Sequence, residues 1–177
     1  GVCVGVDREA ELQDSGIPEI GAVPNHWKVV RIKQLASKIG SGKTPLGGSS
    51  VYVDAGVAFL RSQNIWDEGL RLEDVVYISD EVDRAMRTTR VKPKDILFNI
   101  TGGSIGRSVL VPDKFPQANV SQHVCIIRLR SKRLAEFVAL AMLTQSTKRQ
   151  VAIEQVGAAR DGLNFDQIGR LAIPFPP

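Results

Sequence analysis

Short apolar runs alternate with polar, glycine-rich segments along most of this 177-residue chain. Apolar, β-branched runs bounded by Gly, Asp or Ser are typical of short strands. They predict strands over 27–32, 57–61, 75–78, 95–100, 105–111 and 120–129. Apolar residues spaced three and four apart, or a capping hydroxyl followed by acidic residues, indicate helices instead. They predict helices over 33–39, 79–88, 132–144, 147–155 and 163–171.

This mixture of short strands and helices predicts an α+β fold in a single domain. We expect a small, mostly antiparallel or mixed twisted sheet, glycine-rich loops and several helices at the edges of the sheet. The chain length is typical of one domain. Residues 1–16 are rich in glycine and acidic residues and show no periodicity, so we expect them to form an extended lead-in to a folded domain over 17–177.

The charge is distributed unevenly. The net charge is +4, yet residues 1–27 carry five acidic residues and a single arginine. The remainder of the chain is therefore clearly basic. A basic body is typical of proteins that bind a polyanion such as nucleic acid, although a solvated mixed surface has the same composition.

The few cysteines and histidines argue against a metal site or a disulfide framework. Cys3 and Cys125 are far apart, and no Cys-x-x-Cys pair occurs in the sequence. No apolar run approaches the length of a membrane span. We predict a cytoplasmic protein without a metal or cofactor. No nucleophile motif, zinc-protease motif or dinucleotide fingerprint is present, so we do not expect an enzyme.

The segment Gly42-Lys43-Thr44 resembles the end of a nucleotide-binding P-loop. Its first glycine position is occupied by Ser37, and Pro45 follows where the phosphate-binding helix would begin. A nucleotide-binding enzyme therefore stays only an alternative. Lys43 and Thr44 are better suited to contact the phosphates of a nucleic acid, and an ordinary surface loop is the other interpretation.

Three further segments carry polar side chains between apolar runs. The segment 101–107 combines a glycine turn with Ser104 and Arg107, and so forms either a simple hairpin turn or an anion-binding loop. The amide, guanidinium and imidazole side chains of the other two segments have the donors and acceptors that read base edges. These candidate base contacts are Arg61, Gln63, Asn64, Gln122 and His123, and Arg160-Asp161 is a weaker candidate.

Several motifs occur together in one order along the chain. Trp27 follows a proline-containing segment and precedes the rest, which are Ser41-Gly-Lys-Thr-Pro45, Leu60-Arg-Ser-Gln-Asn-Ile65, Asp95-Ile-Leu-Phe-Asn99, Gly103-Ser-Ile-Gly-Arg107, Ser121-Gln-His-Val124 and Ile173-Pro-Phe-Pro-Pro177. In this order they resemble a target-recognition domain of the specificity subunit of type I restriction–modification enzymes. The resemblance extends over about residues 16–177. One departure is that the family usually has Asn-Gln where this chain has Ser121-Gln122.

The resemblance implies a domain that reads one half of a bipartite target in double-stranded DNA. Methyltransferase subunits and motor-nuclease subunits would perform the chemistry with S-adenosylmethionine and ATP. The second recognition domain and the long connecting helix of such subunits do not occur in this sequence, so a piece of a two-domain subunit and a half-subunit both stay open. A protein-interaction module whose basic loops are merely solvated is a further alternative.

Overall fold

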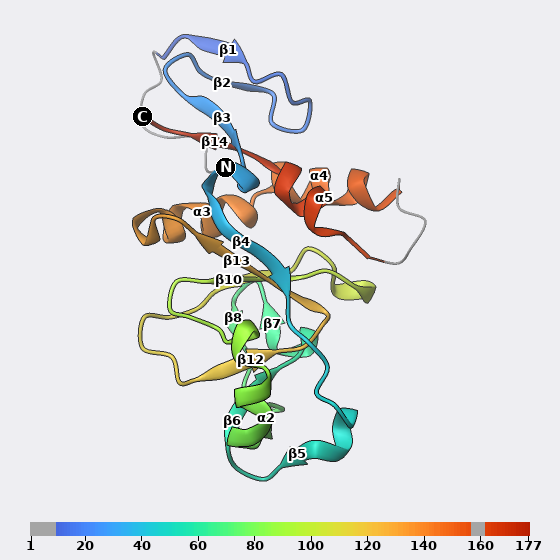
Figure 1. Cartoon of the computed structure of the whole chain (residues 1–177). Coiled ribbons are helices and arrows are strands. Elements are labelled where there is room, and N and C mark those ends of the chain that lie inside the picture. Colours follow the sequence, from blue (N-terminus) through green and yellow to red (C-terminus); the bar gives the residue numbers. More distant parts are fainter. Residues whose placement is uncertain (1–9, 157–161) are drawn as a thin grey trace.

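A four-stranded antiparallel sheet lies at the centre of the computed structural model, which describes residues 10–156 and 162–177 (Figure 1). The strands lie in the order β11 (Ser108–Leu110), β10 (Ile96–Asn99), β13 (Val124–Leu129) and β4 (Ala36–Ser41). Strand β10 is apolar at consecutive positions and entirely buried, because both faces of this sheet are covered. In the register, Phe98 lies opposite Ser108 on one side and Cys125 on the other.

Four helices cover one face of the central sheet. They are α1 (Ile32–Leu35), α3 (Ala135–Met142), α4 (Gln145–Val156) and α5 (Phe165–Arg170). Val138, Met142 and Ile168 pack with Phe98 and Ile127 of the sheet in the larger hydrophobic core. Helix α3 follows a 3₁₀ turn, η5 (Lys132–Leu134), and the two together agree with the amphipathic helix predicted over 132–144.

A second four-stranded sheet packs on the other face of the central sheet. Its order is β12 (Ala118–Val120), β6 (Val57–Leu60), β9 (Val76–Ile78) and β5 (Tyr52–Val53), and β12 runs parallel to β6. Leu60 and Val120 of this sheet share a buried cluster with Leu97 and Ile126 of the central sheet. The mixed sheets and peripheral helices confirm the predicted α+β fold in a single domain.

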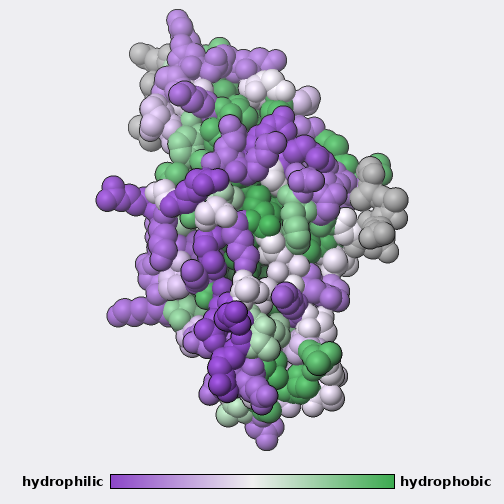
Figure 2. Space-filling model, viewed as in Figure 1, coloured by the Kyte–Doolittle hydropathy of each residue, from purple (hydrophilic) through white to green (hydrophobic). Residues whose placement is uncertain are grey.

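Shorter elements complete the structure. A hairpin of β7 (Ile65–Trp66) and β8 (Gly69–Leu70) lies between β6 and β9 along the chain, and a helix, α2 (Asp80–Ala85), follows β9 on the way to β10. The 3₁₀ turns are η1 (Gly48–Val51), η2 (Ser62–Asn64), η3 (Arg87–Thr89) and η4 (Gly102–Ser104). Figure 2 shows a hydrophobic patch at the lower right, over the segment between β4 and β5, where the Leu46 side chain is 97% exposed.

The two ends of the described chain meet at one end of the molecule (Figure 1). Strand β1 (Leu12–Asp14) pairs with β2 (Ala22–Pro24), and β3 (Lys28–Arg31) pairs with β14 (Ala172–Phe175). Strand β1 thus lies in the predicted lead-in and pairs across the predicted boundary at residue 16. The division of the chain into 1–16 and 17–177 stays a prediction.

Two predicted elements were wrong in part. The helix predicted over 33–39 ends at Leu35, because the following residues pair with β13 as strand β4. The strand predicted over 120–129 is two strands, since a turn at 121–123 passes the chain from the second sheet to the central one. Strand β14 was not expected, because Pro174 lies within it; a proline is tolerated in a strand at the edge of a sheet.

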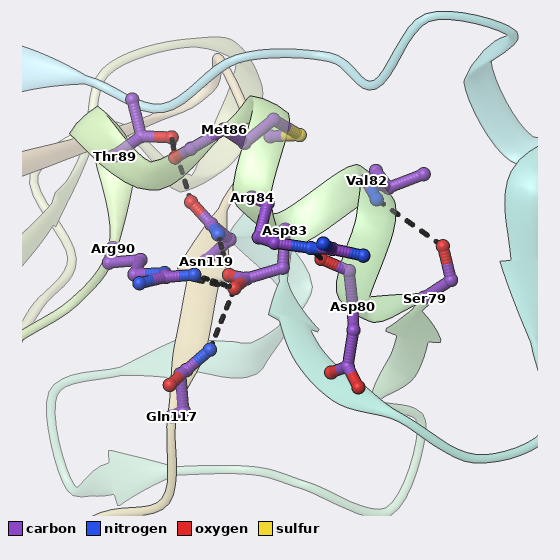
Figure 3. A network of polar contacts seen from close by, with 10 residues as sticks. All are labelled: Ser79, Asp80, Val82, Asp83, Arg84, Met86, Thr89, Arg90, Gln117 and Asn119. Carbon is purple, nitrogen blue, oxygen red and sulfur yellow. Dashed lines mark hydrogen bonds and ion pairs between the residues drawn. The ribbon is translucent and has the colours of Figure 1, made fainter.

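A buried carboxylate fixes α2 to the second sheet (Figure 3). The Asp83 side chain is 1% exposed and accepts hydrogen bonds from Arg90, Gln117 and Asn119. Asn119 in turn accepts a 2.7 Å bond from the Thr89 hydroxyl. Because each partner satisfies the charge or the polar atoms of another, the network is compatible with burial.

Candidate nucleic-acid interface

Four strands from the two sheets end at the same side of the molecule. Backbone hydrogen bonds join the segments that follow them: Gly42 N–H donates to the Val124 carbonyl at 3.0 Å, and Ser121 N–H to the Leu60 carbonyl at 2.9 Å. Ile100 N–H donates to the His123 carbonyl at 3.1 Å. We call this side of the molecule the loop edge, and define it by residues 42–45, 61–64, 101–107 and 121–123.

Lys43 and Thr44 leave the end of β4 as exposed residues on the loop edge. The Lys43 amide donates to the carbonyl of Val120, at the end of β12, at 3.2 Å, so it is bonded within the protein and does not join a phosphate cradle. The next regular element is η1, a single 3₁₀ turn that begins at Gly48. A P-loop needs a helix directly after its lysine and threonine, so the P-loop alternative finds no support in this geometry.

The segment 61–64 forms η2, in which one residue supports the others. Asn64 is 1% exposed; its Oδ1 accepts from the Arg61 amide at 2.9 Å, and its Nδ2 donates to the Arg71 carbonyl at 2.8 Å. Both polar atoms of this amide are therefore occupied inside the protein. Asn64, predicted from the sequence as a base contact, instead holds the backbone of Arg61 and Arg71 in place.

Arg61 and Gln63 differ in how far they are free to contact a ligand. The half-buried Arg61 donates through Nη2 to the Asp74 carbonyl at 2.7 Å, which commits part of its guanidinium to the fold. The Gln63 side chain is exposed, and a hollow of about 490 Å³ lies beside it. Gln63 is thus the residue of η2 with the amide best placed to meet a ligand.

The turn between β10 and β11 places Ser104 and Arg107 on the loop edge. Asn99, at the end of β10, donates from Nδ2 to the Ser104 hydroxyl at 3.0 Å and to the Ser62 carbonyl at 2.8 Å. This buried amide therefore joins the turn to η2. The amides of 105–107 bond within the turn or to Asn99, so the anion-binding interpretation of this loop rests on Ser104 and Arg107 side chains.

Gln122 and His123 are exposed at the turn between β12 and β13. The Nδ1 atom of His123 lies 2.7 Å from the Thr101 hydroxyl, which orients the imidazole from the neighbouring turn. Its other nitrogen, Nε2, lies 3.5 Å from the Gln122 side-chain amide. Thr101 and Asn99 were missed in the sequence, because their roles depend on contacts between segments that are distant along the chain.

Trp66, on β7, carries an arginine on each side. The guanidinium carbons of Arg71 and Arg107 lie 3.5 and 3.7 Å from the centre of its ring. Neither Trp66 nor Arg71 was predicted as a site residue from the sequence. The weaker candidates Arg160 and Asp161 lie outside the described residues.

The described residues contain neither a cluster of metal ligands nor a reactive cysteine. Within 10–156 and 162–177, no three His, Cys, Asp or Glu side chains are grouped so that they could hold a metal ion. Burial raises the pKa of the Cys125 thiol to about 12, so this group is not a nucleophile at neutral pH. The loop edge instead offers cations, amides, a hydroxyl and an imidazole, which are groups that contact phosphates and base edges.

In the same part of the chain, no helix is both long enough and apolar enough to span a membrane.

Comparisons with known proteins agree with this geometry. Residues 24–177 match the family model described as the type I restriction modification DNA specificity domain. No curated protein matches the sequence.

Solved structures show the same fold at low sequence identity. The HsdS subunit from Thermoanaerobacter tengcongensis matches with a TM-score of 0.58 and 15% identity over 88% of this chain and 34% of that one. The type I restriction–modification S subunit from M. genitalium matches with a TM-score of 0.56 and 15% identity over 90% and 37%. A chain from a study of assembly and conformational transition of the type I R-M system matches with a TM-score of 0.59 and 16% identity over 88% and 35%. The chain spans about a third of the length of each.

Proposed function

Because the chain belongs to the type I restriction modification DNA specificity domain family, we propose that it recognises the sequence of double-stranded DNA and reads one half of a bipartite target. In this proposal it performs no chemistry itself and needs no cofactor. It supplies the DNA sequence preference of a larger restriction–modification assembly, and it works in the cytoplasm, where that DNA is found.

One observation carries the proposal beyond the family. The loop edge gathers side chains from four segments that are up to 80 residues apart in the sequence, and most of them are exposed. Exposed and half-buried groups of this kind have no role in the core, whereas a DNA duplex presents partners for all of them. A reader of this type needs cations for the backbone and neutral polar side chains for the bases.

The side chains divide into these two groups by chemistry. Lys43, Thr44, Ser104 and Arg107 would contact phosphates, which fixes the register and makes the affinity depend on salt. A second group would choose the sequence through hydrogen bonds to base edges in a groove. That group consists of Arg61, Gln63, Gln122 and His123.

The partners in the proposal follow from the family resemblance. Methyltransferase subunits would modify the DNA with S-adenosylmethionine, and motor-nuclease subunits would cleave it with ATP. A single recognition domain contacts only a half-site, so we expect the isolated chain to bind DNA weakly and to gain affinity in the assembly.

Selection from a random duplex pool tests the proposal. The purified chain is incubated with the pool at low salt, and the retained duplexes are sequenced. We expect enrichment of one short motif, since base contacts distinguish sequences while phosphate contacts do not. Retention without any enriched motif would overturn the proposal, because it would leave only a generic basic surface.

A further inference from the structure

Two arginines lie against the two faces of Trp66, which is next to the loop edge in the sequence. The guanidinium carbon of Arg71 is 3.5 Å from the ring centre, and that of Arg107 is 3.7 Å from it. Two guanidinium groups so close to one ring would overlap if they shared a face, so the indole separates them. Arg71 follows β8 and Arg107 precedes β11, so the stack joins two loops.

A hydrogen bond to η2 positions Trp66, the central residue of this stack. The Trp66 indole N–H donates to the Gln63 carbonyl at 2.8 Å. Asn64 bonds the backbone of Arg71 twice: its carbonyl accepts from the Arg71 amide at 2.9 Å, and its side-chain amide donates to the Arg71 carbonyl at 2.8 Å. The positions of Trp66 and Arg71 are therefore set by the buried Asn64 turn.

The side that carries Arg107 is held by a lysine from α4. Lys148 donates from Nζ to the Gly106 carbonyl at 2.6 Å and to the two carboxylate oxygens of Asp67 at 2.8 and 2.9 Å. Asp67 also accepts from the Ser108 amide at 2.9 Å. Lys148 thus holds Gly106 directly and Ser108 through Asp67, so it fixes the residues on both sides of Arg107.

Neither guanidinium group forms a salt bridge with a carboxylate of residues 10–156 or 162–177, although Glu73 and Asp74 line the hollow beside Arg71. Cation–π contact stabilises each guanidinium on the ring, but it does not neutralise the charge. Two like charges held near each other are best compensated by a ligand with closely spaced negative charges.

We propose that Arg71 and Arg107 bind neighbouring phosphates of one DNA strand and that Trp66 is the residue that positions them. This inference rests on the proposed function. Contact with the ring occupies one side of each guanidinium group and leaves N–H groups that can bind phosphate oxygens in pairs. A DNA strand carries one phosphate per nucleotide at a regular spacing, so a fixed pair of cations contacts consecutive positions.

The test measures the affinity of the full chain for its selected duplex and for an unrelated duplex over a series of salt concentrations. The variants are R71Q, R107Q, the double variant and W66L. The control is R133Q, which removes the same charge from an exposed position on η5, at the far end of β13. Thermal unfolding of each variant establishes that it is folded.

We expect R71Q and R107Q each to reduce the affinity for both duplexes by about tenfold. Each should reduce the steepness of log affinity against log salt by about 0.9, the value for one lost phosphate contact. W66L keeps both charges, yet it should reduce the affinity for both duplexes, because the ring no longer fixes the spacing between the two guanidinium groups. R133Q should change the affinity far less. A change of base preference in R71Q or R107Q would overturn the proposal, because it would mean that the arginine reads a base.

Duplexes in which single phosphates are replaced by neutral methylphosphonates locate the contact. We expect the wild-type chain to lose affinity at two adjacent positions of one strand, and the double variant to be insensitive at those positions. If the wild-type chain selects a motif but R71Q and R107Q behave like R133Q, the stack is structural only and this inference fails alone. If the wild-type chain binds no duplex, the proposed function fails as well.

Discussion

Gly42 packs so closely against Val120 that a Cβ atom on residue 42 would lie 1.7 Å from the Val120 carbonyl oxygen. The same atom would lie 2.6 Å from the carbonyl oxygen of Ser121. Strand β4 therefore reaches the end of β12 only because residue 42 has no side chain. This approach places Lys43 on the loop edge, beside the turn that carries Gln122.

We expect Gly42→Ala to lower the free energy of unfolding by about 3 kcal/mol, since backbone atoms must move apart to admit a methyl group. It should also weaken DNA binding by displacing Lys43. Gly103→Ala is the matched control, because a Cβ atom there meets nothing within 4 Å. Urea denaturation measures the stability of the two variants, and titration with the selected duplex measures their affinity for DNA. Equal losses in the two variants would show that the close packing at Gly42 is not required.

Gln63 and Asn64 are neighbours with opposite expected roles. Gln63→Ala should leave stability unchanged and reduce affinity by about 1–3 kcal/mol at one base pair of the selected motif. Asn64→Ala should lower the free energy of unfolding by about 2 kcal/mol, because it removes the bonds to Arg61 and Arg71. Denaturation and binding to single-position variants of the motif separate the two effects. Uniform weakening by Gln63→Ala would contradict base reading.

The Asp83 network is expected to stabilise the fold (Figure 3). Asp83→Asn removes the charge that pairs with Arg90 and turns an amide group toward the donors of Gln117 or Asn119. We predict a loss of about 3 kcal/mol in the free energy of unfolding. Asp80→Asn, at an exposed position of the same helix, is the control. A similar, small loss in both variants would refute the structural role.

One ion pair makes a pH-dependent contribution to stability. The hydrogen bonds from Arg170 lower the pKa of Glu154, and this pair joins α4 to α5. A carboxyl whose pKa is lower in the folded state stabilises the protein above its ordinary pKa of about 4.3, and the contribution is lost as the pH falls through the lowered value.

We therefore expect Glu154→Gln to cost up to about 1 kcal/mol at pH 7, since Arg170 is 44% exposed and the pair is screened. The cost should shrink as the pH falls below about 4.3 and disappear once the pH has passed the lowered pKa of Glu154. Denaturation at a series of pH values measures the difference between the two proteins. The exposed Glu68→Gln serves as the control. A difference that is constant with pH would contradict this account.

The sequence predicted what depends on local pattern. The amphipathic spacing of Leu134, Phe137, Val138 and Ala141 located α3, and the glycines at 102 and 103 located the turn between β10 and β11. The residues after Leu35 were predicted as helix, because their pattern does not reveal that they pair with β13. Pairing between distant strands overrides local propensity in such segments.

The sequence identified the segments of the candidate site but not the contacts between them. The four segments of the loop edge were identified from their polar side chains, and the fold places them together. Asn64 was expected to face a ligand, but a small polar side chain in a loop is equally suited to hold backbone groups, and only the fold decides between these roles. Arg71 gave no signal, since its partner Trp66 is placed by the hairpin of β7 and β8.

Amide hydrogen exchange of the full chain, with and without the selected duplex, shows directly whether the loop edge contacts DNA. We expect the duplex to slow exchange in 42–45, 61–64, 101–107 and 121–123 and to leave α3 unaffected. Slower exchange confined to other surfaces, with the loop edge unchanged, would contradict the claim that this edge reads DNA.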